Sequence, residues 1–97
     1  MYVGLAKLEI WMDGNRELKY KRNILQKIKT RVKNKFNASI AQVDENPDEA
    51  NFAELGISIT GSSSKIVKAE MTKTLNFIES LSLARTVEEK SDIVYFE

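Results

Sequence analysis

A row of basic side chains is the feature of this sequence that is best suited to chemistry. Lys19, Arg22, Gln26, Lys29 and Lys33 follow one another at spacings of three and four residues, so on a helix they line a single exposed stripe. Lysine and arginine bind phosphates through charge and release counterions as they do so. The row therefore predicts binding of a polyanion such as RNA. The alternative interpretation is a solvated helix face whose long side chains keep the protein in solution.

The distribution of charge along the chain favours binding of a polyanion, although the net charge of +1 alone does not suggest it. Residues 1–36 hold ten basic and three acidic side chains, whereas residues 37–97 hold five basic and eleven acidic ones. The near-neutral total is thus a cancellation between a positive block and a negative block. Such asymmetry between the halves of a chain indicates a polyanionic partner.

The sequence contains few residues suited to catalysis. None of the 97 residues is cysteine or histidine, which excludes a thiolate nucleophile, an imidazole base and metal sites built on either residue. The four glycines are too dispersed for a dinucleotide-binding loop, and no P-loop motif is present. We therefore expect a protein that is not an enzyme and needs no cofactor or metal.

The elements that must position the basic row follow from hydrophobic periodicity. Alternating apolar residues predict strands, and apolar residues spaced three and four apart predict helices. The expected elements are a strand over 2–12, a helix from about 16 to 36, strands over 37–44 and 51–60, a helix over 66–81 and a last strand from 83, with a bend at 88–91. This βαββαβ order predicts one ferredoxin-like α+β domain over residues 1–97, in which both helices cover one face of a four-stranded antiparallel sheet.

The opposite face of that sheet is the second candidate site. The strand periodicity places Val3, Leu5, Trp11 and Phe52 there, among charged residues. The third strand lacks the aromatic motif with which RNA-recognition modules of this topology stack bases. A partly apolar, uncovered sheet face favours a homodimer interface.

Lys21 and the acidic segment 44–49 do not fit the simple pattern of exposed charges. The helical angle of Lys21 falls inside the apolar stripe, so its ammonium group either reaches past the sheet edge to solvent or meets a carboxylate such as Glu9 or Asp13. The segment 44–49 resembles the start of a calcium loop, but Pro47 and the missing closing glutamate argue against one. We expect a solvated acidic loop there.

Three spaced motifs resemble a known family. They are the opening Met1–Gly4, the segment Glu17–Arg22 at the helix start and Phe36–Ala41 at the next strand. Together they resemble the YlxP-like family of small bacterial proteins, which implies a ferredoxin-like fold, a dimer and genes close to those of translation and ribosome maturation, with no established activity. Glu17 replaces the serine that caps the helix in the family, so Asn15 is expected to take that role. The family's Asp-Leu-Trp-Gln segment before the third strand is absent.

These observations lead to one expected function and one alternative. The first is a non-enzymatic, homodimeric accessory factor that contacts RNA or the ribosome through Lys19, Arg22, Lys29 and Lys33. The alternative is a homodimeric protein–protein interaction module that binds no nucleic acid. The first residues lack the pattern of a signal peptide and no apolar stretch approaches the length of a membrane span, so a cytoplasmic location is expected.

Overall fold

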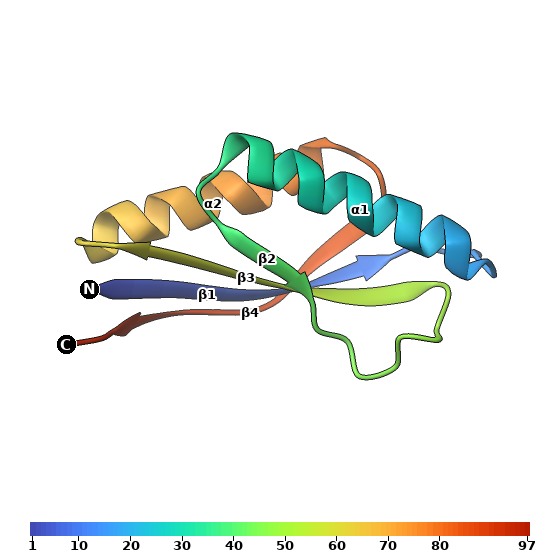
Figure 1. The fold of residues 1–97 in the computed structure, drawn as a ribbon, viewed down its shortest axis with the longest axis horizontal. Helices are drawn as coiled ribbons and strands as arrows, with labels where there is room; N and C mark the ends of the chain where they lie inside the picture. The colour runs from blue at the N-terminus through green and yellow to red at the C-terminus, as the bar shows by residue number, and fades with distance from the viewer.

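The computed structural model describes all residues from 1 to 97 and confirms the ferredoxin-like prediction (Figure 1). Its four strands form one antiparallel sheet in the order β2-β3-β1-β4, and both helices cover the same face. The elements are β1 (Tyr2–Trp11), α1 (Leu18–Lys35), β2 (Ser39–Gln42), β3 (Phe52–Gly61), α2 (Ser64–Ser80) and β4 (Arg85–Tyr95).

The core forms where the alternating strands meet the helices. On β1 the even positions are buried, with Leu8 and Ile10 at most 3% exposed, and on β3 the odd positions are buried, including Leu55 and Ile57. This alternation turns one face of the sheet toward the helices and leaves the other face open. The apolar pattern therefore determines which side chains each face presents.

The helices add their apolar stripes to this core, although each stripe begins later than the sequence suggests. Leu25 and Val32 of α1 are buried, and so are Val67 and Ile78 of α2. Two first-turn residues that we expected in the stripes, Leu18 and Ile66, are 42% and 57% exposed. The buried part of each stripe therefore starts after these residues, with Ile24 in α1 and with Val67, still in the first turn, in α2.

Close packing of α2 on the sheet requires a glycine on β1. A β-carbon added at Gly4 would approach Cγ1 of Val67 to 2.7 Å, so α2 rests directly on the strand backbone at this point.

Neither α1 nor α2 is both long enough and apolar enough to cross a membrane.

The second strand is shorter than expected. We predicted a strand over 37–44, but regular pairing covers only Ser39–Gln42. One more ladder bond follows, from the Val43 N–H to the Glu54 carbonyl (2.9 Å), and then Oδ1 of Asp44 accepts from the Glu54 N–H (3.2 Å). A side chain therefore takes the place of the next backbone acceptor, and the chain leaves the sheet.

The expected irregularity in the last strand is a β-bulge. Lys7 of β1 lies opposite Lys90, while Leu8 lies opposite Glu88, so Glu89 has no partner on β1. Beyond the bulge β4 continues to the chain terminus, where Met1 and Phe96 exchange two hydrogen bonds of 2.7 Å each. The two termini consequently lie side by side at one end of the sheet (Figure 1).

Candidate nucleic-acid interface

The solvent side of α1 carries a continuous field of positive charge. Between Leu18 and Lys35 the helix holds eight basic residues and no acidic one. Lys19, Arg22 and Lys33 of the predicted row are exposed, and Lys29 is half-buried because its helical angle borders the core side. The structure thus brings the four predicted binding residues together on one face.

Nothing in the chain neutralises this field. Salt bridges link Lys7 to Glu54 and Glu89, Lys21 to Asp44, Lys73 to Glu70 and Arg85 to Asp13. None of the basic residues of α1 other than Lys21 has a carboxylate within 4.0 Å. These cations therefore remain available for an external anion.

Positive charge also continues round the back of the helix. Lys27 and Arg31 border a shallow hollow, together with Gln26 and Thr30, and the Gln26 amide donates to the Thr30 hydroxyl across it (3.1 Å). The Lys35 ammonium lies 4.6 Å from the ring centroid of Phe77, a cation–π contact at the end of the helix. A ligand could thus meet cations on both flanks of α1.

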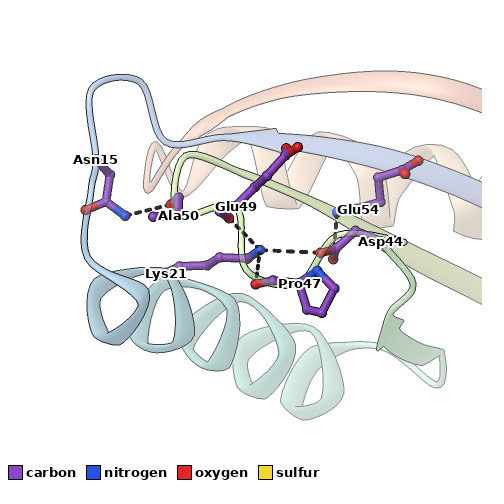
Figure 2. Close-up of polar contacts among 7 residues, drawn as sticks. All are labelled: Asn15, Lys21, Asp44, Pro47, Glu49, Ala50 and Glu54. Atoms are coloured by element: carbon purple, nitrogen blue, oxygen red, sulfur yellow. Dashed lines mark hydrogen bonds and ion pairs between the residues drawn. The ribbon is translucent and has the colours of Figure 1, made fainter.

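Lys21 is not part of the exposed basic row but is buried in a polar contact with the segment 44–49 (Figure 2). Its side chain is 2% exposed, and its ammonium group donates to Asp44 Oδ2 (3.3 Å), the Pro47 carbonyl (3.1 Å) and the Glu49 carbonyl (2.8 Å). It therefore meets a carboxylate, but Asp44 is its partner.

The two partners suggested for Lys21, Glu9 and Asp13, were wrong. Glu9 accepts from the Trp11 indole at 3.0 Å, and Asp13 binds the Arg85 guanidinium through two 3.0 Å hydrogen bonds. The segment 44–49 is correspondingly not a freely solvated loop, because its backbone and its first carboxylate hold a buried ammonium.

The carboxylate of Asp44 is held in its charged form. Burial acts to raise its pKa, but the Glu54 N–H, the Gln42 side chain and the charge of Lys21 together outweigh burial and hold the pKa below the ordinary value of 3.8. Its side chain is 1% exposed. Asp44 is thus an ionised group at the junction of α1, β2 and β3.

Asn15 supports the same junction rather than capping the helix. Its side-chain amide donates to the Ala50 carbonyl (2.7 Å) and to the Glu17 carbonyl (3.0 Å), and its oxygen accepts from the Glu17 N–H (3.2 Å). Glu17 itself is the N-cap residue and makes no side-chain cap bond. The expected capping role was therefore wrong, since Asn15 ties the helix entrance to the end of the loop instead.

The four residues predicted as a dimer interface all lie on the open face of the sheet, but in two groups. Trp11 and Phe52 pack together at one end, with ring centroids 4.5 Å apart and ring planes tilted by 55°. Val3 and Leu5 lie toward the other end, where Leu5 is 44% exposed. Along a strand, six residues span about 20 Å, so Leu5 and Trp11 do not form one patch.

Charged side chains occupy the space between those groups. The ammonium of Lys7 lies 3.3 Å from the Glu54 carboxylate and 3.9 Å from that of Glu89. A hydrogen bond with Glu54, together with burial and the charge of Glu54, raises the pKa of Glu89. The open face is thus apolar at both ends and charged in the middle.

A shallow groove of about 630 Å³ crosses the open face, and sequence reasoning missed it. Small residues create the hollow: Ala41 and Gly56 lie opposite each other on β2 and β3. Leu5 and Val43 supply exposed apolar walls, each 44% exposed. No run of residues in the sequence indicates this groove, because all four strands contribute to it.

The structure also contains no group of three or more acidic side chains placed to hold a metal ion.

The comparisons with known proteins agree with the fold and the motifs. The family model described as "Protein of unknown function (DUF503)" matches residues 3–91. The uncharacterized protein YlxP of Bacillus subtilis (strain 168) is 35% identical over 86 residues, which cover 88% of this chain and 92% of that protein.

Solved structures support the fold alone. The de novo designed protein Foldit4 aligns with a TM-score of 0.58 at 12% identity and covers 99% of this chain and 98% of its own. The designed protein LFR1 1, described with a ferredoxin fold, aligns with a TM-score of 0.51 at 15% identity and covers 91% of this chain and 83% of its own.

Removing the Lys21 ammonium is expected to destabilise the fold strongly. Lys21→Ala leaves Asp44 as a buried charge without its cation, a change that costs about 3–5 kcal/mol in comparable pairs. Urea denaturation measures the loss. Lys19→Ala, an exposed lysine on the same helix, is the matched control and should change the free energy of unfolding by about 0.5 kcal/mol or less.

A paired substitution separates loss of the ion pair from loss of packing. Lys21→Met combined with Asp44→Asn keeps the side-chain volume and an acceptor for the Glu54 N–H while removing both charges, so it should recover much of the lost stability. Equal losses for Lys21→Ala and Lys19→Ala would refute the structural role of Lys21.

The stability contributed by Asp44 should depend on pH in a defined direction. Since its pKa is lower in the folded chain than the ordinary 3.8, the contribution is complete above that value and disappears as the pH falls through the lower, folded-state pKa. Urea midpoints of the wild type and of Asp44→Asn should therefore differ near neutral pH and converge in acid. The control Asp13→Asn affects an exposed pair and should produce a much smaller difference. A difference that grows in acid would contradict the assignment.

Proposed function

Because the chain belongs to the DUF503 family, whose function is not defined, we propose its role from the structure: it is a non-enzymatic accessory factor that binds RNA, in the ribosome or its precursors, through α1. The observation that carries the proposal is the row Lys19, Arg22, Lys29 and Lys33, which has no ion pair within the chain. Such a face gains most from an external polyanion, because no internal carboxylate must first be displaced.

The geometry of the row suits a phosphate backbone. From Lys19 to Lys33 the helix rises about 21 Å at 1.5 Å per residue, which is long enough to contact several successive phosphates. Double-stranded RNA is recognised mostly through its phosphates and its shape, without base readout. The absence of acidic residues from α1 therefore supports binding that depends on RNA form more than on sequence.

Salt dependence tests this proposal directly. Each phosphate contact contributes a slope of roughly −0.7 to −0.9 to the dependence of log affinity on log salt, so four contacts predict a slope of about −3 for structured ribosomal RNA. Substituting Arg22, Lys29 and Lys33 by glutamate should weaken binding at low salt by tenfold or more and flatten the slope. Filter binding or fluorescence anisotropy measures both quantities.

The matched control places the same charge change on the other helix. Lys65, Lys68 and Lys73 of α2 are exposed, and their replacement by glutamate alters the net charge equally without touching α1. This variant should keep most of the affinity and the slope. No retention of RNA by the wild type at low salt, or equal losses in both triple variants, would refute α1 as the binding face. Co-migration with ribosomal particles on a low-salt gradient should follow the same order of variants.

The groove of the open sheet face and the exposed apolar residues near it favour a second candidate function, a homodimeric protein–protein interaction module. Leu5 and Val43 are each 44% exposed beside that groove, and Phe96 is 64% exposed at the end of the chain. Exposed apolar side chains beside a groove typically mark a protein contact.

Charge introduced on the open face tests this candidate. Leu5→Glu or Trp11→Lys should shift the mass measured by sedimentation toward the monomer, because each places a charge against apolar partner surface. Ile66→Glu is the matched control, since it changes an apolar residue of α2 that is 57% exposed and faces away from the sheet. An unchanged mass for the first two variants would exclude the open face as the interface.

A further inference from the structure

The strand β4 is the longer of the two edge strands of the sheet. Strand order makes β2 and β4 the two edges of the sheet, and β4 has eleven residues where β2 has four. Nine of the eleven residues of β4 are exposed. A long edge strand presents unpaired N–H and C=O groups on which another strand can pair.

The backbone hydrogen bonds of β4 alternate between residues that bond to β1 and residues whose N–H and C=O groups point outward. Phe96 exchanges both of its backbone bonds with Met1, so by alternation Val94, Asp92 and Lys90 also bond inward to β1. Ser91 and Ile93 therefore direct their backbone groups away from the sheet. The Ile93 N–H fits this alternation, because its acceptor is Oδ1 of the neighbouring Asp92 at 2.8 Å and not a backbone carbonyl of β1.

Among two-fold axes placed from Lys90 to Tyr95, only the axis at Ser91 sets opposite charges against each other. In a two-fold antiparallel pair, a two-fold axis at Lys90 or at Asp92 would place like charges opposite each other. An axis at Ser91 instead places Lys90 of each copy opposite Asp92 of the other, and this happens twice. Ser91 then meets its own copy as a hydrogen-bonded pair, which is the pair that its outward backbone groups can form.

Both members of this complementary pair can take an ion partner, since Asp92 is engaged only through the hydrogen bond that its Oδ1 accepts from the Ile93 N–H. Neither Lys90 nor Asp92 forms a salt bridge within the chain, and both border the same side of the sheet. Lys90 also lies directly opposite Lys7 in the β1–β4 register, so it gains from a new carboxylate nearby. The bulge at Glu89 limits the regular ladder to the short segment around Ser91.

We propose that β4 is a self-association edge, on which a second copy of this chain pairs its own β4 in antiparallel orientation about a two-fold axis at Ser91. The two four-stranded sheets then become one sheet of eight strands. The basic helices end up far apart in this assembly, because α2 lies over β4 whereas α1 lies over β2 at the other edge. The inference does not rest on RNA binding by α1, and it uses a different surface from the open face.

A proline at the axis tests the proposal without breaking the internal sheet. Since the Ser91 N–H points outward, Ser91→Pro removes no bond to β1 but blocks pairing with a second copy. Sedimentation velocity from micromolar to millimolar concentration should show a reversible dimer for the wild type and at least a tenfold weaker one for Ser91→Pro. Circular dichroism and urea denaturation check that the variant is folded.

Charge exchange tests the register itself. Lys90→Asp should weaken the dimer by opposing two carboxylates, and adding Asp92→Lys to the same chain should restore it, because each copy again presents opposite charges. Lys65→Glu is the control for a charge change away from β4 and should leave the dimer unchanged. A wild type that stays monomeric throughout, a dimer that survives Ser91→Pro, or failure of the double variant to recover would overturn the proposal. A dimer that is lost in Leu5→Glu yet kept in Ser91→Pro would assign the interface to the open face instead.

Discussion

The buried contact between Lys21 and Asp44 is the constraint on which the arrangement of this fold depends. One carboxylate accepts from the backbone of β3 and from the ammonium of α1, while that ammonium also binds two carbonyls of the intervening loop. The contact thereby ends β2, seals the loop over the helix entrance and fixes α1 against the sheet (Figure 2). Buried ion pairs are expensive to desolvate, so the value of this one lies in specifying a single packing more than in raw stability.

The same contact determines what α1 offers to solvent. A helix with eight basic residues could rotate about its axis at little electrostatic cost, but the Lys21 side chain can reach its three oxygen partners in only one rotation. That rotation buries Leu25 and Val32 and turns Arg22 and Lys33 outward. The charge of Lys21 is therefore engaged within the chain, and its contacts help to set which basic side chains of α1 face solvent.

Local patterns predicted most of the fold, and long-range contacts account for what they missed. Alternation on β1 and β3 identified the buried face, because a strand buried on one side must repeat every two residues. The partner of Lys21 could not be predicted, since Asp44 lies 23 residues away beyond a strand and carries no periodic signal. Likewise, periodicity correctly placed four residues on the open face of the sheet, namely Val3, Leu5, Trp11 and Phe52. It did not show that they lie in two separate groups, because that depends on how far apart they are along the strands. The row of basic residues on α1 was predictable because all its members lie on one helix.

The separation of charge in the sequence has a structural counterpart in the layers of the fold. Acidic residues of the second block are engaged elsewhere: Asp44 faces the interior, while Glu54 and Glu89 gather around Lys7 on the open sheet face. Asp44 pairs only with the buried Lys21 of α1, and no carboxylate lies within 4.0 Å of the other basic residues of that helix. The near-neutral net charge therefore does not describe the exposed surface of α1. A polyanion and a protein partner would consequently meet opposite sides of the sheet. Binding of one therefore leaves the surface of the other free, and coupling between the two would have to pass through the sheet or through the Lys21 junction.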